Sequence, residues 1–138
     1  MECEPENPDF LYMLGDIQLQ INLLEKAESS YRKVGILNPA NPDIWVDLSE
    51  VVAERTGVQE ALNIVQEACE KYPANAQNFY RSAAYLFLLG CEKESMETLE
   101  TALSKDPQRH QDFFSYLPEA INSPSILALI DRYQYKEN

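Results

Sequence analysis

The 138-residue sequence contains few glycines, few cysteines and a single histidine. Its 4 glycines leave little for tight β-turns, which favours helices. Its 3 cysteines form no CxxC pair and cannot all pair within one chain, so we expect no disulfide scaffold and a reducing, cytoplasmic location. The longest run without charged or strongly polar residues, Ala83 to Cys91, is far shorter than the roughly 20 residues that span a bilayer.

Groups for catalysis and metal binding are also scarce. His110 has no nucleophile or acid at a recognised spacing. The cysteines are too scattered for a zinc site, and the glycines form no phosphate-binding loop. We therefore expect no enzymatic activity, no cofactor and no metal.

Positive charge is the next deficit. The sequence has 23 acidic against 11 basic side chains, a formal net charge of −12. Such a surface repels the phosphates of nucleic acids and of anionic lipids. We expect a protein or peptide as partner, without nucleic-acid binding or membrane insertion.

A period of 34 residues runs through the chain. It is marked by two series, Pro5, Pro39, Pro73 and Pro107, and then Asn7, Asn41 and Asn75. The triplet Asn-Pro-Asp at 7–9 and at 41–43 predicts helix starts, with asparagine as the cap and proline as the first helical residue. Between these starts the apolar residues recur with helical spacing, and Gly57 and Gly90 interrupt them midway. Each period therefore predicts two helices.

Particular residues recur within the period. The first repeat has Leu11, Leu14, Gly15, Ala27, Tyr31 and Pro39; the second has Trp45, Leu48, Ala61, Ala68 and Pro73; the third has Phe79, Ala83, Ala102 and Pro107. This pattern resembles the tetratricopeptide repeat family. Departures from the family's markers stand at Gln18, Ser49, Val65, Ser82, Ser95 and Leu99.

The resemblance implies an all-α fold, a right-handed α-α superhelix built of antiparallel helix pairs. We expect a single domain over 1–138, with repeats at about 8–41, 42–75 and 76–109 and a degenerate C-terminal cap at 110–138. Small markers such as Gly15 and Ala27 let paired helices approach closely, and bulky ones such as Trp45 and Tyr31 fill the gap to the next pair. We interpret these markers as core rather than binding residues.

The two ends of the chain differ in pattern. Glu4 to Asn7 resembles the closing turn of a preceding repeat, so we expect the chain to be the C-terminal part of a longer array. In the cap, Pro118 ends a short helix and Ser123 begins a last one. The apolar face expected for this last helix comprises Ile126, Leu127, Ile130 and Tyr133.

In the family, the first helices of the pairs line a groove that receives an extended or helical peptide. The candidate groove residues of this chain are Tyr12, Met13, Asp16, Asp47, Glu50, Glu54, Tyr80, Arg81 and Phe87, with Phe114 closing the apolar part. Their mixture of acidic and apolar groups predicts a basic and apolar ligand. The alternative is that the acidic groups only keep the groove soluble.

Relatives that bind a C-terminal carboxylate use basic and amide groups on these helices. Here Tyr12, Asp16, Asp47 and Gln77 stand at those positions, and only Arg81 keeps the expected charge. The sequence therefore predicts a scaffold that binds a peptide or partner protein in its groove or self-associates through the ends of the array. The alternative is an accessory or substrate-recruiting domain of a larger enzyme or regulatory protein.

Overall fold

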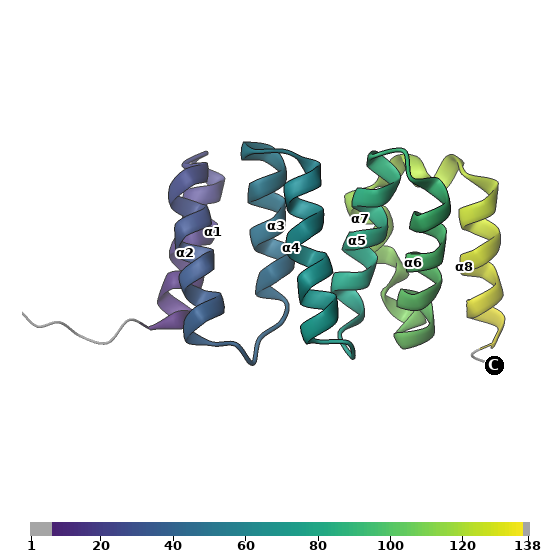
Figure 1. Cartoon of the computed structure of the whole chain (residues 1–138), viewed down its shortest axis with the longest axis horizontal. Coiled ribbons are helices and arrows are strands. Elements are labelled where there is room, and N and C mark those ends of the chain that lie inside the picture. Colours follow the sequence, from purple (N-terminus) through teal and green to yellow (C-terminus); the bar gives the residue numbers. More distant parts are fainter. Residues whose placement is uncertain (1–6, 137–138) are drawn as a thin grey trace, which may run out of the picture.

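The computed structural model describes residues 7–136, which form helices and turns without a strand. Figure 1 shows the helices as a row of antiparallel pairs, with α1 and α2 at one end and α8 at the other. The α-helices are α1 (Pro8–Gln20), α2 (Leu24–Leu37), α3 (Ile44–Arg55), α4 (Val58–Lys71), α5 (Ala76–Leu88), α6 (Glu92–Lys105), α7 (His110–Tyr116) and α8 (Pro124–Lys136). Two short 3-10 turns, η1 (Pro107–Arg109) and η2 (Pro118–Asn122), flank α7. Residues Glu4 to Glu6 of the expected closing turn lie outside the described range.

Asparagine caps begin two of the three repeats. The side chain of Asn7 accepts a hydrogen bond from the backbone N–H of Asp9 (2.8 Å), and that of Asn75 accepts one from the backbone N–H of Asn78 (3.1 Å). Each side chain satisfies a backbone donor that the first helical turn leaves open.

The helix start predicted at Pro42 is wrong by two residues. Helix α3 begins at Ile44, after a turn that includes Pro42 and Asp43. Asn41 Oδ1 accepts from the backbone N–H of Asp43 in this turn (3.2 Å). Side chains of the next repeat also bond the turn: that of Asn75 donates to the Asp43 carboxylate (3.0 Å), and that of Asn78 donates to the Pro42 carbonyl (3.3 Å).

Glycine ends the first helix of two pairs, as the sequence predicts. Gly57 has φ +148° and Gly90 has φ +83°, both in the region that side chains rarely adopt. These turns let the chain reverse direction within two or three residues.

Two apolar clusters fill the row. The first joins α1 to α4 with part of α5, and the second joins α5 to α8. Small residues set the closest approaches: a Cβ on Gly15 would lie 2.6 Å from the Tyr31 ring, and one on Gly35 would lie 2.5 Å from the Trp45 ring. Tyr31 is buried, in agreement with its core assignment, whereas Trp45 is half-buried at the edge of the first cluster.

The cap follows the expected order of elements. Ser123 Oγ accepts from the backbone N–H of Ile126 (3.4 Å) and so caps α8. Ile126 and Ile130 are buried, but Leu127 is 41% exposed and Leu129 occupies the buried side in its place. Leu127 follows Ile126 by one residue, a turn of about 100° around the helix axis, which carries it off the buried face. Among residues 7–136, no helix combines the length and the apolar character needed to cross a bilayer.

Candidate functional site

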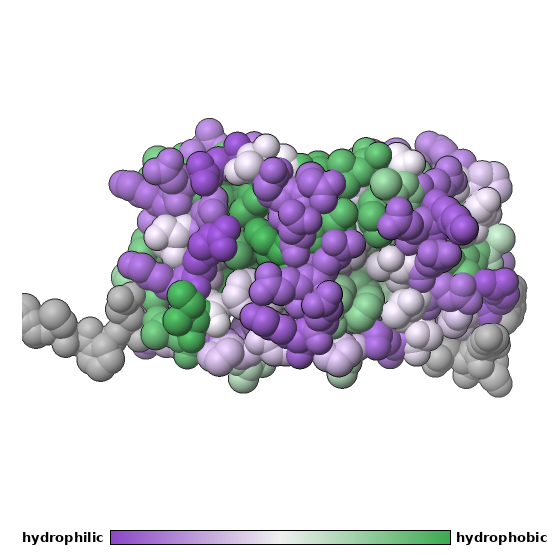
Figure 2. Space-filling model, viewed as in Figure 1, coloured by the Kyte–Doolittle hydropathy of each residue, from purple (hydrophilic) through white to green (hydrophobic). Residues whose placement is uncertain are grey.

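Side chains of the odd-numbered helices meet on one side of the row, which we call the inner face. Along it α3 contacts α5, and α5 contacts α7. In Figure 1, α1 lies behind α2 and α7 lies behind α5. Hydrophilic side chains cover most of the side seen in Figure 2, and apolar ones show in the gaps between them.

Tyrosine hydroxyls engage two of the predicted carboxylates. The Tyr12 hydroxyl, on α1, donates to the carboxylate of Asp47, on α3. The Tyr31 hydroxyl donates to Asp16 Oδ1 (2.5 Å), and the rings of Tyr12 and Tyr31 meet edge to face with their centroids 5.7 Å apart. These contacts tie the first repeat together and join it to the second.

Asp47 lies in an environment that opposes its negative charge. Burial raises the pKa of its carboxyl to about 6, the nearby negative charge of Glu50 adds to the increase, and the positive charge of Arg81 opposes it. A buried carboxylate loses hydration that one neutral hydroxyl donor does not fully replace. The charge of Asp47 is therefore sensitive to pH near neutrality.

Arg81 is held between a carboxylate and an aromatic ring. Its Nη1 donates to Glu50 Oε1 (2.9 Å), and its guanidinium carbon lies 4.0 Å from the centroid of the Tyr116 ring. Only 11% of the Arg81 side chain is exposed. The guanidinium thus joins α3, α5 and α7, and little of it remains for a ligand.

Beside this cluster the inner face is hollowed. The hollow has a volume of about 430 Å³ and is lined by Glu50, Glu54, Leu88, Tyr116, Leu117 and Glu119. Glu54 and Glu119 are exposed, and neither forms an ion pair within residues 7–136. The hollow therefore combines an apolar lining with two carboxylates that have no counter-charge.

The remaining predicted residues do not share one position. Tyr80 is 1% exposed within the second cluster, where its hydroxyl donates to the Asp106 carbonyl (2.6 Å). Its assignment to an accessible groove surface is therefore wrong, because the cap packs over this part of α5. Phe87 is half-buried against the same cluster. Met13 is 59% exposed on α1, away from the hollow.

Sequence reasoning missed Tyr116, Leu117 and Glu119, which the cap contributes to the hollow. It named Phe114 instead, and Phe114 packs against the rings of His110 and Phe113. The cap departs from the 34-residue period after Pro118, so the period gives no register for these residues. The turn that Pro118 predicts was the only available signal that the end of α7 would face a neighbouring helix.

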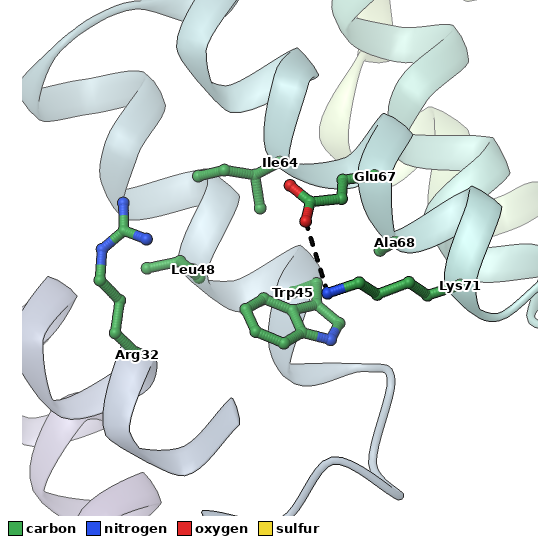
Figure 3. Close-up of a pocket in the computed structure, with 7 residues that line it drawn as sticks. All are labelled: Arg32, Trp45, Leu48, Ile64, Glu67, Ala68 and Lys71. Carbon is green, nitrogen blue, oxygen red and sulfur yellow. Dashed lines mark ion pairs between the residues drawn. The ribbon is translucent and has the colours of Figure 1, made fainter. Parts of the chain in front are cut away.

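A second cavity, of about 200 Å³, lies between α2 and α4 (Figure 3). We call it the Trp45 crevice; its lining residues are Arg32, Trp45, Leu48, Ile64, Glu67, Ala68 and Lys71. Figure 3 shows the indole of Trp45 between Arg32 and Lys71, and Lys71 Nζ pairs with Glu67 across 3.4 Å. The Trp45 ring also packs closely on Gly35 of α2.

The Cys69 thiol lies in an environment that opposes its ionisation. Burial raises the pKa of the Cys69 thiol to about 11, and its Sγ lies 3.7 Å from the hydroxyl of Ser82. A thiol held protonated is a poor nucleophile. Across residues 7–136, no three His, Cys, Asp or Glu side chains are grouped so that they could hold a metal ion.

Comparison with known proteins identifies the architecture. The chain is similar to a crystal structure of MamA, with a TM-score of 0.65 and 18% identity over 97% of this chain and 82% of that one. It is also similar to TTC0263, a thermophilic TPR protein of Thermus thermophilus, with a TM-score of 0.64 and 21% identity over 96% of this chain and 82% of that one. The fold is that of a tetratricopeptide-repeat solenoid. No family model and no curated protein matches the sequence.

This likeness confirms the fold expected from the 34-residue period, an all-α, right-handed superhelix of antiparallel pairs. At these identities the likeness shows the tetratricopeptide-type fold alone. The partner is inferred from the surface.

Proposed function

We propose that this tetratricopeptide-type chain is a protein-interaction scaffold whose inner face binds a peptide, or a segment of a partner protein, that carries basic and apolar side chains. The observation that supports this proposal is the hollow beside Arg81. An extended concave surface is the feature that helical solenoids use for binding.

Charge supports the basic character of the ligand. Arg81 already neutralises Glu50, whereas Glu54 and Glu119 at the same hollow have no counter-charge among the described residues. A lysine or arginine side chain between them would gain favourable electrostatics, and the net charge of −12 would speed its approach.

The apolar lining of the hollow supports an apolar side chain in the ligand. Leu88 is 43% exposed and lies at the hollow with Leu117 and the Tyr116 ring. An aliphatic or aromatic side chain next to the basic one would remove this surface from water. At the N-terminal end of the inner face, the Tyr12 hydroxyl and the Asp47 carboxylate already bond to each other. The C-terminal half of this face is therefore favoured for binding.

The test uses the chain as bait for a random peptide display library. We expect the selected peptides to carry Lys or Arg next to an apolar residue. For one such peptide, measured by fluorescence anisotropy, Glu54→Gln/Glu119→Gln should raise Kd roughly tenfold, and added salt should weaken binding.

A matched control removes the same charge elsewhere. Glu94 and Glu97 are exposed on α6, and Glu94→Gln/Glu97→Gln should leave Kd nearly unchanged. Selected peptides rich in acidic residues, or equal loss of binding in both variants, would show that the hollow is not the site. Self-association through an end of the row would use a different surface and is compatible with groove binding.

A further inference from the structure

The Trp45 crevice has a counterpart one period later in the chain, where Phe79 stands in the place of Trp45. The residues that line this counterpart are Gln66, Cys69, Glu70, Phe79, Ser82 and Thr98, from α4, α5 and α6. The two cavities therefore occupy the same place in the repeat. A feature that only one of them has is not required for the stacking of consecutive repeats.

The walls of the Trp45 crevice are more apolar than those of its counterpart. Leu48 corresponds to Ser82 one period later. Ile64 corresponds in the same way to Thr98. The helices of the second and third repeats pack together with hydroxyl groups at both positions. Stacking of repeats therefore does not account for the apolar walls of the first cavity.

Two cations flank the Trp45 indole at the rim of the crevice (Figure 3). The side chains of Arg32 and Lys71 are 51% and 60% exposed, and each pairs with a glutamate one turn earlier on its own helix, across 3.0 Å and 3.4 Å. Exposed pairs of this kind contribute little to stability and are screened by salt. One period later, Arg32 is replaced by the uncharged Gln66. Both cations of the crevice can therefore turn to a carboxylate on a ligand at little cost.

The indole of Trp45 brings a hydrogen-bond donor to the same place. Its Nε1 is buried, and no described residue accepts a hydrogen bond from it. Phe79, at the equivalent position, has no such group. A buried donor without a partner costs free energy, which an acceptor on a ligand recovers. Figure 3 shows the nitrogen edge of the indole on the Lys71 side of the crevice, so a carboxylate there would lie near both the N–H and the ammonium.

We propose that the Trp45 crevice binds an apolar side chain of a partner protein that has an acidic residue next to it in sequence. The apolar side chain would pack on Trp45, Leu48 and Ile64, and the neighbouring carboxylate would accept hydrogen bonds from Arg32 or Lys71. The volume of about 200 Å³ is below the usual size of a small-molecule pocket. It suits one side chain whose backbone stays outside the crevice.

This site is separate from the one proposed on the inner face. The crevice and the hollow share no lining residue. Their ligands also carry opposite charge, because the hollow offers carboxylates and the crevice rim offers cations. A partner could therefore occupy either site without the other.

The test follows the indole N–H of Trp45 by NMR, because the only tryptophan of the chain gives a single resonance. The full chain is titrated with three blocked tripeptides, Asp-Leu-Asp, Asp-Ser-Asp and Lys-Leu-Lys. Asp-Leu-Asp should shift the resonance saturably, with a Kd of about 1 mM or below. The other two should bind at least about tenfold more weakly, since one lacks the apolar group and the other reverses the charge.

A double variant gives the crevice residues that the chain already carries one period later. Arg32→Gln and Ile64→Thr copy Gln66 and Thr98, so the repeat architecture tolerates them, and circular dichroism verifies folding. The double variant should raise the Kd of Asp-Leu-Asp at least about tenfold. Arg32→Gln alone, at an exposed position, should raise it about threefold.

The matched control, Glu54→Gln/Glu119→Gln, lies in the hollow and should leave this Kd nearly unchanged. A resonance that does not shift with Asp-Leu-Asp up to about 20 mM would overturn the proposal. So would equal binding of Lys-Leu-Lys, or a Kd that the double variant leaves unchanged. Isovalerate that binds as tightly as Asp-Leu-Asp would also overturn it, because the occupant would then be a small organic acid. Each of these failures leaves the selection of basic peptides by the hollow unaffected.

Discussion

The two joints between consecutive repeats solve the same packing problem in different ways. The first joint places Trp45 of α3 against Gly35 of α2. The second joint, one period later, has Phe79 of α5 and Cys69 of α4 at these positions, where they line one shallow cavity. A larger ring is matched with glycine and a smaller ring with cysteine. Total side-chain volume at the joint is conserved, while the individual residues are not.

The polar contacts of the joints differ as well. The first joint holds Asp47 through the neutral hydroxyl of Tyr12, whereas the second pairs Glu50 with the charged Arg81. The first joint therefore holds a carboxylate without an ion pair, and the second holds one that is paired. We expect the first joint to be more sensitive both to added volume and to pH.

The largest effect should come from replacing the glycine of the first joint with the cysteine that stands at the same position in the second joint. In Gly35→Cys, the new Cβ would lie 2.5 Å from the Trp45 ring, and the sulfur adds further volume. Such overpacking should lower the free energy of unfolding by about 3 kcal/mol. Urea denaturation followed by circular dichroism measures the loss.

Completing the exchange should restore stability. The double variant Gly35→Cys/Trp45→Phe reproduces the Cys69 and Phe79 combination, so it should recover about 2 kcal/mol of that loss as a favourable coupling energy. The reverse single change, Cys69→Gly, leaves space at the second joint and should cost only about 1 kcal/mol. Strictly additive effects in the double variant would refute the conserved-volume interpretation.

A smaller effect should follow from the charge of Asp47. Its pKa of about 6 in the folded state lies above the ordinary value of 3.8, so folding favours the protonated form. The stabilisation is present below the ordinary pKa and is lost as pH rises through 6. Between pH 4.5 and 7.5, Asp47→Asn should gain roughly 1–2 kcal/mol relative to the wild type, a figure that allows for its partial exposure.

Denaturant midpoints at several pH values measure this gain. Asparagine keeps an acceptor for the Tyr12 hydroxyl, so the contact between α1 and α3 is retained. An Asp47→Asn variant that follows the wild type at every pH would show that burial at the first joint does not oppose the charge.

The sequence predicts which residues stand at equivalent positions in the two joints, because the 34-residue period assigns those positions. Asn7 as a cap, and Gly57 and Gly90 as turns, depend only on local backbone chemistry, and the structure bears them out. Asn75, at the same place in the third period, is a cap as well. The Asn41 side chain makes the same local bond, accepting from the backbone N–H of Asp43 (3.2 Å), but α3 begins only at Ile44, and side chains of the next repeat bond Pro42 and Asp43.

The surroundings of the candidate site are harder to predict from the sequence, because they depend on the cap. Glu50, Glu54 and Arg81 fall on the expected face, since helical phase alone places them. The burial of Tyr80 and the contact of Tyr116 with Arg81 both depend on the cap, where Pro118 breaks the period. Helical phase predicts which side of a helix a residue occupies, but not which element will cover it.

The smallest predicted effect is a difference in stability cost between replacing Lys105 and replacing Lys71, which stand at equivalent positions. At the second joint Lys105 Nζ lies 4.8 Å from the centroid of the Phe79 ring, whereas at the first joint Lys71 pairs with Glu67. A cation over an exposed aromatic face contributes about 0.5–1 kcal/mol, and an exposed ion pair about 0.3 kcal/mol. Lys105→Met should therefore cost about 0.5 kcal/mol and Lys71→Met less. A double-mutant cycle with Phe79→Leu assigns the larger loss to the ring if the cost of Lys105→Met vanishes once the ring is replaced; an unchanged cost would place it elsewhere, and the two joints would then differ only in how they divide their side-chain volume and in the polar contacts of Asp47, Glu50 and Arg81.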